Sequence, residues 1–284
     1  MSEHEQFSAV TEAGALSGWV DGEGPPALLL HGGPGLGYEY MDPVVDELRT
    51  DFRVATFQQR GLGPSTLQGP FTITQAIDDI LSVLDALDWD RALLVGHSWG
   101  AHLALRFTAA HPDRLLAMLA IEPIGIVGDG GRGPFQTELL ARVPQDTRKR
   151  LDELRAREEA QEATPEETLE AMGITWPFYF ADPDTAPPMP SKRFSNEVFA
   201  GLAGEMAIDT GAVAAALAAT RVRYRVLVGG ASPIPWGQAA RPSADLSPQA
   251  AVTVVPAAGH FVWLEAPGRV RAAALNLLGH EASS

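Results

Sequence analysis

Six short apolar runs constrain the fold of this chain more than any other feature of its sequence. They lie at residues 27–31, 52–57, 91–97, 115–122, 225–230 and 251–256. Nearly continuous apolarity over so few residues is typical of parallel strands that are buried on both faces. Stretches with apolar residues at three- and four-residue spacing, typical of helices, lie at residues 41–50, 73–88, 100–111 and 268–280. This alternation predicts an α/β protein with a mostly parallel, doubly wound sheet and helices on both faces.

The alternation stops in one central stretch. Residues 123–207 have no strong strand signal and hold charged helical runs such as residues 145–172. We therefore expect a core of residues 1–122 and 208–284, with residues 123–207 inserted between two strands as a helical cap. Before residue 21, alternating residues predict a hairpin of edge strands.

Composition excludes several classes of function. The net charge is −15 over 284 residues, whereas polyanionic partners such as nucleic acid favour basic surfaces. Cysteine is absent, which excludes disulfides, thiolate metal sites and a cysteine nucleophile. No apolar run approaches the roughly 18 residues of a membrane span, and the acidic first residues do not resemble a secretory signal. We expect a cytoplasmic enzyme that acts on a small molecule without a metal or organic cofactor, and with no nucleic-acid or membrane partner.

The motif GHSWG at residues 96–100 directly follows a predicted strand and opens a predicted helix. In this context G-x-S-x-G is typical of a strand-to-helix elbow that exposes a nucleophilic serine, here Ser98. The start of the helix behind Ser98 supplies free N–H groups and positive potential for an oxyanion. The alternative is that Ser98 only caps the helix.

A second glycine-rich motif, HGGPG at residues 31–35, follows an earlier predicted strand. Glycines at such a place let the backbone approach a ligand closely. The backbone N–H groups of Gly33 and Trp99 would together form an oxyanion hole. The alternative is a glycine-rich turn without a catalytic role. His31 is expected to brace this loop.

His260 is the expected general base for Ser98. It lies in the loop after the last predicted strand, within AAGHFVWLEAP at residues 257–267. A loop histidine at this place, third in chain order, is where a base for the serine belongs. The other histidines are weaker candidates because they lie in the elbow, on the following helix or in the tails. These are His97, His102, His111, His4 and His280.

These motifs give the chain a family resemblance. HGGPG, GHSWG and GHFVWLEAP, together with FQQRGLGPS at residues 57–65, resemble the α/β-hydrolases and, within them, the proline iminopeptidase-like group, peptidase family S33. The resemblance covers nearly the whole core. It implies an α/β-hydrolase fold with a cap after the strand that follows the nucleophile elbow. It also implies Ser98 as nucleophile, His260 as base, and Gly33 and Trp99 as oxyanion donors.

The chain departs from the family pattern at three places. Gln58 stands where the family usually has the aspartate of DQRG, a change that we expect to affect loop bracing only. The family's aminopeptidases hold the substrate's amino terminus with a Trp-x-x-Trp-Glu signature in the cap, and residues 175–183 (TWPFYFADP) do not match it. Ser232 stands where the acid of the triad is expected.

We expect the acid at Glu122 instead. A triad acid must reach the far nitrogen of the histidine, and strand ends beside the nucleophile strand point toward the site. Glu122 ends the next predicted strand, where burying an ionisable group is costly unless it has a partner. The position is similar to that of the glutamate in some haloalkane dehalogenases of the same fold. The alternatives are that Glu122 anchors the cap or pairs with an arginine, with Asp245 as a weaker rival for the acid.

These residues predict a serine hydrolase that cleaves an ester, lactone, thioester or amide of a small, largely apolar molecule through an acyl-enzyme. Four cap aromatics either line an apolar pocket or pack the cap onto the core. They are Trp176, Phe178, Tyr179 and Phe180. One alternative is an aminopeptidase acting on N-terminal proline, with Glu197 or Glu205 holding the amine. Another is a binding protein, or a non-hydrolytic enzyme, on a hydrolase scaffold, which the serine at position 232 keeps open.

Overall fold

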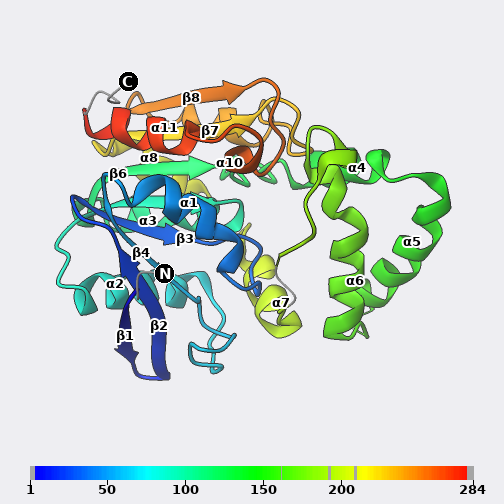
Figure 1. The fold of residues 1–284 in the computed structure, drawn as a ribbon, viewed down its shortest axis with the longest axis horizontal. Helices are drawn as coiled ribbons and strands as arrows, with labels where there is room; N and C mark the ends of the chain where they lie inside the picture. Colours follow the sequence, from blue (N-terminus) through cyan, green and yellow to red (C-terminus); the bar gives the residue numbers. More distant parts are fainter. Residues whose placement is uncertain (1–3, 161, 191–192, 208–209, 280–284) are drawn as a thin grey trace.

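A computed structural model describes residues 4–160, 162–190, 193–207 and 210–279. These residues contain an eight-stranded sheet with the order β1-β2-β4-β3-β5-β6-β7-β8 (Figure 1). The strands are β1 (Glu5–Thr11), β2 (Gly14–Asp21), β3 (Pro26–Leu30), β4 (Arg53–Phe57), β5 (Ala92–His97), β6 (Leu115–Ile121), β7 (Tyr224–Gly229) and β8 (Ala250–Val255). The pairs β1–β2 and β2–β4 are antiparallel, and the other pairs are parallel. The predicted α/β class, the edge hairpin and the mostly parallel sheet are confirmed.

The helices surround this sheet and extend beyond it. They are α1 (Asp42–Leu48), α2 (Ile73–Ala86), α3 (Trp99–Ala110), α4 (Arg132–Arg142), α5 (Gln145–Glu159), α6 (Pro165–Thr175), α7 (Asn196–Glu205), α8 (Thr210–Ala219), α9 (Ala240–Ala244), α10 (Val262–Glu265) and α11 (Arg269–Leu278). Among the described helices, no single one has the length and apolar composition needed to cross a membrane. Helices α7 and α8 have that length and composition only when they are taken together, and they are bent by 70° relative to each other.

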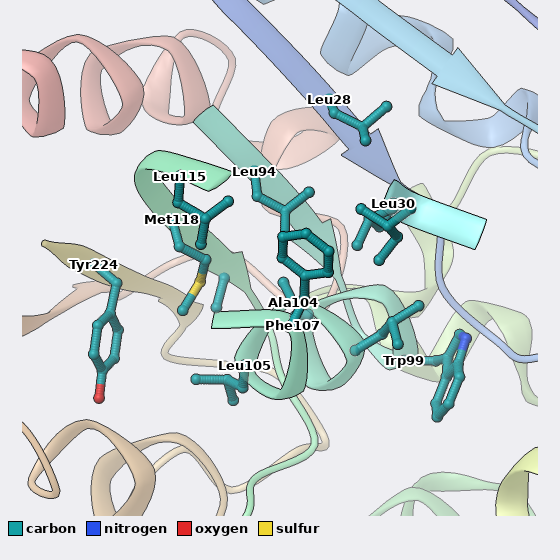
Figure 2. Packing of buried hydrophobic residues seen from close by; sticks show 14 of the residues in the cluster. Leu28, Leu30, Leu94, Trp99, Ala104, Leu105, Phe107, Leu115, Met118 and Tyr224 are labelled. Atoms are coloured by element: carbon teal, nitrogen blue, oxygen red, sulfur yellow. The ribbon is translucent and has the colours of Figure 1, made fainter. Parts of the chain in front are cut away.

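Two apolar cores lie on opposite faces of the sheet, because side chains alternate along each strand. Leu28 and Leu30 of β3 pack in the core that includes α2, α3 and α8. Figure 2 shows this core around α3. Ala27 and Leu29 of the same strand pack in the second core, which includes α1, α10 and α11. Helices therefore cover both faces, as a doubly wound sheet requires.

Helices α4 to α7 lie in the chain between β6 and α8, within residues 123–207, which we call the insertion. In Figure 1, α4, α5 and α6 lie beyond the carboxyl ends of the strands. Part of the insertion has a small apolar cluster of its own, formed by Val143, Leu151, Leu154 and Ala171. The expected end of the insertion at residue 207 borders residues 208 and 209, which are outside the described chain. The division into core and cap stays a prediction.

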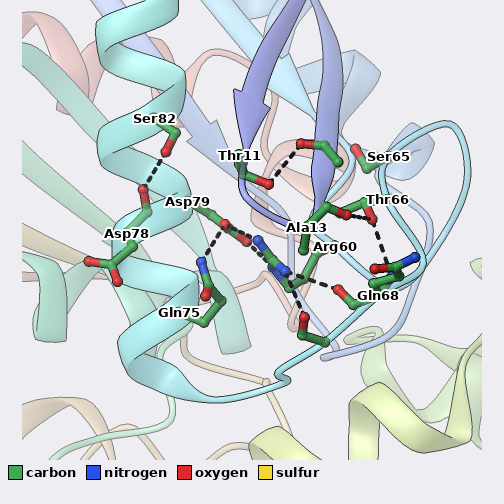
Figure 3. A network of polar contacts seen from close by, with 12 residues as sticks. Thr11, Ala13, Arg60, Ser65, Thr66, Gln68, Gln75, Asp78, Asp79 and Ser82 are labelled. Atoms are coloured by element: carbon green, nitrogen blue, oxygen red, sulfur yellow. Dashed lines mark hydrogen bonds and ion pairs between the residues drawn. The ribbon is translucent and has the colours of Figure 1, made fainter.

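A buried ion pair fixes the loop that follows β4. Arg60 donates through Nε and Nη2 to the two carboxylate oxygens of Asp79 on α2, each at 2.6 Å (Figure 3). The two side chains are only 5% and 4% exposed. Arg60 Nη1 also donates to the backbone oxygen of Gln68 at 2.9 Å. A guanidinium bound at several nitrogens holds the FQQRG loop in one geometry beside the carboxyl end of the sheet.

Candidate active site

Strand β5 ends in a sharp turn at Ser98, which opens α3. The φ angle of Ser98 is 54°, in the left-handed region that serine seldom adopts. A Cβ atom at Gly96 would lie 2.3 Å from the carbonyl oxygen of Gly100, and one at Gly100 would lie 2.1 Å from that of Leu30. Glycine is therefore required on both sides of the turn. A strained turn of this kind is typical of functional sites, where surrounding structure holds it in place.

The Ser98 side chain is half-buried and is not used to cap the helix. Ser98 is the N-cap residue of α3, but its hydroxyl makes no capping hydrogen bond, so the capping alternative is wrong. The ring of His97, the preceding residue, lies 4.5 Å from the ring of His260 between centroids. Among the described residues, no hydrogen bond joins Ser98 Oγ to His260. General bases often reach hydrogen-bond distance only when substrate is bound.

Glu122 directly follows β6 at the same level as Ser98 directly follows β5. The two strands are parallel, and His97 pairs with Ile121 in their register. The next residue on each strand is therefore Ser98 on one side and Glu122 on the other. Glu122 has a φ of 52°, so both strands break with a left-handed residue at the same height. Adjacent strand ends place the two side chains at one edge of the sheet.

The carboxylate of Glu122 is buried, with the residue 1% exposed, and is surrounded by donors. Its Oε1 accepts the backbone N–H of Gly229 at 2.5 Å, and its Oε2 accepts the hydroxyl of Ser232 at 2.5 Å. Nδ1 of His260 lies 3.1 Å from the same Oε2. Within the described chain these groups, and not an arginine or the insertion, are its partners. The alternative that Glu122 is a structural anchor for the insertion is therefore wrong.

Burial controls the charge of both groups. It raises the pKa of Glu122 to about 8, against hydrogen bonds from Ser232 and Gly229 that favour the carboxylate. It lowers the pKa of His260, which is 3% exposed, to about 3. Burial therefore favours the neutral form of both groups, and a neutral imidazole beside an ionised carboxylate forms as the pH rises past the pKa of Glu122. A neutral ring with its hydrogen on Nδ1, facing Glu122, has Nε2 available to accept a proton.

The His260 loop is held by hydrogen bonds from two directions. The backbone N–H of His260 donates to the carbonyl oxygen of Tyr179 in the insertion at 2.7 Å. Glu265 on α10 accepts the backbone N–H of Gly259 at 2.7 Å and that of Ala181 at 2.8 Å. One carboxylate thus ties the residue before the histidine to the insertion. These bonds fix the position of the imidazole relative to residues 179–181.

The expected oxyanion donors have free N–H groups. Within the described residues, neither the N–H of Gly33 nor that of Trp99 donates a hydrogen bond to the protein. Gln59 links the two motifs: its Oε1 accepts the indole N–H of Trp99 at 3.0 Å, and its Nε2 donates to the carbonyl oxygen of His31 at 2.9 Å. Two free donors on braced loops suit an oxyanion.

Gln58, which stands in place of the family's usual aspartate, braces a loop, as expected. Its Nε2 donates to the carbonyl oxygen of Leu36 at 3.1 Å, just beyond the HGGPG motif. Its Oε1 accepts a hydrogen bond at 3.1 Å from Arg193, which lies in the insertion. His31 contributes as well, because its Nε2 accepts the backbone N–H of Gln59 at 3.2 Å. An amide supplies both a donor and an acceptor, which an aspartate cannot.

The four aromatic residues of the insertion occupy different surroundings. The ring of Tyr179 lies 5.2 Å from that of His260. The rings of Trp176 and Phe180 lie 4.5 and 5.3 Å from that of Phe261, the residue after the histidine. Phe178 instead packs against the apolar cluster inside the insertion. Their contact with substrate stays a prediction.

The remaining candidate residues lie in other contacts. Asp245 forms an exposed ion pair with Arg241 at 2.7 Å, so it is not the acid beside His260. Glu205 accepts the backbone N–H of Ile73 at the start of α2, and Glu197 is exposed. These positions give no support to the aminopeptidase alternative. His280 lies outside the described residues.

Two residues that support Glu122 and the His260 loop are missed by the sequence analysis. Ser232 is interpreted there only as a missing acid, although its hydroxyl binds the carboxylate of Glu122. Glu265 lies within the GHFVWLEAP motif itself, and a carboxylate five residues after the histidine is the signal that could have indicated it. The role of Ser232 has no such signal, because it depends on a contact across 110 residues.

Comparisons with known proteins identify the family and agree with the fold. A model of the alpha/beta hydrolase family matches residues 27–273. An alpha/beta fold family hydrolase from Bacillus anthracis str. Sterne has a similar structure, with a TM-score of 0.71 and 16% identity over 97% of this chain and 99% of that chain. This likeness shows the fold alone.

Curated relatives match a smaller part of the chain. Epoxide hydrolase B of Mycobacterium tuberculosis is 34% identical over 129 residues, which are 44% of this chain and 36% of that protein. A probable proline iminopeptidase of Leptolyngbya boryana is 36% identical over 104 residues, which are 34% of this chain and 30% of that protein. The matches thus span about a third of the length of these relatives.

Proposed function

The chain belongs to the alpha/beta hydrolase family, and we propose that it is a serine hydrolase of small, largely apolar esters, lactones, thioesters or amides. One observation carries this proposal. Ser98 and Glu122 end neighbouring parallel strands at the same level, and Nδ1 of His260 lies 3.1 Å from the Glu122 carboxylate. A hydroxyl, an imidazole and a carboxylate in this arrangement support acyl transfer through a covalent intermediate.

In the proposed reaction, Ser98 Oγ attacks the carbonyl carbon of the substrate while His260 Nε2 accepts the hydroxyl proton. The N–H groups of Gly33 and Trp99 donate to the oxyanion of the tetrahedral intermediate. The intermediate collapses to an acyl-enzyme as the leaving group departs with the proton from His260. Water then attacks the acyl-enzyme, again with His260 as base, and the Ser98 hydroxyl is restored.

Glu122 is the proposed third member of this triad. When His260 accepts the proton, an imidazolium forms in a buried place, where an unpaired charge is costly. The carboxylate beside Nδ1 stabilises that charge and fixes the ring tautomer. The hydrogen bonds from Gly229 and Ser232 in turn favour the ionised carboxylate.

We propose that the insertion acts as a cap that selects the substrate. Three aromatic side chains gather beside the base, because Tyr179 packs on His260 while Trp176 and Phe180 pack on Phe261. Such surroundings favour an apolar acyl or alcohol group. The aminopeptidase and the non-hydrolytic or binding alternatives are outcomes of the experiment below.

The proposal is tested with a fluorophosphonate probe, which forms a covalent bond only with an activated serine. We expect one label per chain on wild type, none on Ser98→Ala, and unchanged labelling of Ser82→Ala, a control on the exposed face of α2. A panel of short p-nitrophenyl esters, lactones and proline p-nitroanilide then identifies the substrate class. Folded wild type that stays unlabelled at pH 8 would contradict the proposal and favour a binding protein. Selective turnover of proline p-nitroanilide would favour the aminopeptidase.

A further inference from the structure

A continuous chain of hydrogen bonds joins the HGGPG loop to the His260 loop behind the site. The backbone N–H of Gly32 donates to the hydroxyl of Tyr40 at 2.5 Å. The same hydroxyl lies 2.9 Å from Nδ1 of His97. Nε2 of His97 lies 3.2 Å from the backbone carbonyl oxygen of His260. Four groups from distant parts of the sequence therefore form one path.

The direction of each hydrogen bond in this path follows from its two ends. The carbonyl oxygen of His260 can only accept, so Nε2 of His97 carries the hydrogen. The N–H of Gly32 can only donate, so the oxygen of Tyr40 accepts there. The Tyr40 hydroxyl then donates its own hydrogen to Nδ1 of His97. A neutral His97 satisfies every donor and acceptor in the path, whereas a protonated His97 would leave the Tyr40 hydrogen without an acceptor.

The surroundings hold the path in this state. Tyr40 and His97 are 9% and 2% exposed. Burial, and then the neighbouring His260, lower the pKa of His97 far below its usual range, and burial raises the pKa of Tyr40. The rings of Trp263 and His97 pack edge to face with centroids 4.7 Å apart, and those of Phe261 and Tyr40 do so with centroids 6.1 Å apart. Both rings are thus buried against aromatic side chains, and among the described residues their polar partners are those of the path.

We propose that Tyr40 and His97 are positioning residues that hold the oxyanion loop and the His260 loop at a fixed separation. The proposal rests on the proposed function, because it assigns the N–H of Gly33 and the ring of His260 to the same tetrahedral intermediate. Gly32 directly precedes Gly33, and the carbonyl oxygen of His260 belongs to the residue that carries the base. Each end of the path therefore belongs either to the residue that carries a reacting group or to the residue next to it.

A fixed separation matters because both loops act on the same substrate atoms. The oxyanion donors contact the carbonyl oxygen while His260 exchanges a proton with the atoms on the carbonyl carbon. A displacement of about 1 Å between such groups can lower the rate about a hundredfold. A loss of this kind affects kcat more than KM, because the alignment is needed mainly in the transition state.

The experiment compares Tyr40→Phe, which removes one oxygen and keeps the ring, with His97→Gln and the double variant. Gln can still place an N–H near the carbonyl oxygen of His260 but has no acceptor at the position of Nδ1. We expect Tyr40→Phe to lower kcat on p-nitrophenyl butyrate between about tenfold and a hundredfold, with KM within about twofold. The second-order rate of fluorophosphonate labelling should fall in parallel. The loss of kcat in the double variant should be little larger than that in the less active of the two single variants, because the residues act as one path.

Tyr224→Phe is the matched control. Tyr224 is also a buried tyrosine whose hydroxyl donates a hydrogen bond, to the carbonyl oxygen of Ser243 at 3.1 Å, but it lies at the other end of the sheet, where β7 begins. A similar loss of melting temperature in Tyr40→Phe and Tyr224→Phe, with a kcat loss only in Tyr40→Phe, supports the proposal. Near-wild-type kcat and labelling in Tyr40→Phe, or the same kinetic loss in Tyr224→Phe, would overturn it.

Failure of the proposed function gives a different pattern. If Ser98→Ala retained turnover, the serine mechanism would be wrong, and the positioning role would fall with it. If Ser98→Ala were inactive while Tyr40→Phe behaved as wild type, only the positioning role would be wrong. Strictly additive effects of Tyr40→Phe and His97→Gln would also contradict a shared path.

Discussion

The hydroxyl of Ser232 lies 2.5 Å from Oε2 of Glu122 and donates its hydrogen to that carboxylate. Ser232 stands where the family resemblance places the acid, so this position holds a hydrogen-bond donor to Glu122, the proposed acid, instead of a carboxylate. The backbone N–H of Ile234 in turn donates to Ser232 Oγ at 3.1 Å, which orients the hydroxyl. The pKa of the Glu122 carboxyl therefore depends on the hydrogen bond from Ser232.

Ser232→Ala should move the acidic limb of the pH–rate profile to higher pH. Burial raises the pKa of Glu122, and the Ser232 hydrogen bond opposes that shift. The active pair has neutral His260 and ionised Glu122, so kcat/KM rises with pH as the pair loses its shared proton. A hydrogen bond to a charged group contributes about 1.5–3 kcal/mol, which corresponds to about one to two pH units. The measurement is kcat/KM between pH 5 and 10.

Ser247→Ala is the control for this prediction, since Ser247 is a buried serine that bonds the backbone N–H of Gln249 away from the site. It should leave the profile unchanged. An acidic limb in Ser232→Ala that coincides with that of wild type would show that Ser232 does not stabilise the ionised carboxylate.

Glu265→Gln should move the same limb in the opposite direction. The negative charge of Glu265 contributes to the raised pKa of Glu122, so its removal favours the ionised carboxylate. The amide retains one oxygen acceptor for the N–H of Gly259 or Ala181, which limits the disturbance of the His260 loop. We expect a downward shift of less than about one unit, because the charge acts at a distance through a partly polar medium. An upward shift would contradict this electrostatic account.

Trp176→Ala should change substrate preference and leave the chemistry intact. Its ring packs against Phe261 beside the base, with centroids 4.5 Å apart. We expect KM for longer acyl esters to change by roughly tenfold, since losing buried contacts with a side chain costs about 1–3 kcal/mol, while fluorophosphonate labelling of Ser98 persists. Phe178→Ala is the control, because Phe178 packs inside the insertion. Equal kinetics of Trp176→Ala and wild type on every acyl chain length would show that Trp176 does not contact substrate.

Asp79→Asn should lower stability strongly. The carboxylate forms two hydrogen bonds of 2.6 Å with Arg60 in a buried place, so the variant leaves a guanidinium without its counter-charge. Breaking such a pair costs about 3–5 kcal/mol of unfolding free energy. Urea unfolding monitored by tryptophan fluorescence measures this loss. A cost below about 1 kcal/mol would mean that the pair is effectively solvated.

The sheet was predictable because its strands are short, apolar and separated by polar or glycine-rich turns. The run at residues 115–122, for example, corresponds to β6 (Leu115–Ile121). Helix α8 (Thr210–Ala219) was not predicted. Its sequence TGAVAAALAA is rich in alanine and has no polar face, so it lacks the apolar stripe by which a helix is recognised.

The residues of the proposed site can be picked out from the sequence where a motif or a strand end marks them. Ser98 lies in a pattern that requires glycine on both sides, and Glu122 is an acid at the end of an apolar strand. Tyr40 was not predicted, because it meets His97 across 57 residues and no spacing in the sequence records that contact. The donors around a buried carboxylate depend on how loops meet after folding.

Moving the carboxylate from position 122 to position 232 tests whether a side chain on the loop after β7 also reaches His260. Ser232→Asp in a Glu122→Gln background places a carboxylate on the loop after β7, next to the same carboxylate site. We expect it to restore part of the kcat lost in Glu122→Gln, because Ser232 Oγ and His260 Nδ1 both contact Glu122 Oε2. Ser232→Asn in the same background is the uncharged control. Equal kcat for the two double variants would show that position 232 no longer reaches His260.

The kcat of Glu122→Gln on any ester that the wild type hydrolyses measures the contribution of the Glu122 carboxylate to catalysis, because this change keeps the size of the side chain and removes its charge. Glu47→Gln is the matched control, since Glu47 also accepts backbone N–H groups, from Gly268 and Arg271, but at α1 and α11. We expect a loss of up to about 10⁴ in kcat for Glu122→Gln, by analogy with the aspartate-to-asparagine change in serine proteases, and near-wild-type kcat for Glu47→Gln. Near-wild-type kcat in a folded Glu122→Gln variant would contradict the assignment of Glu122 as the acid of the triad.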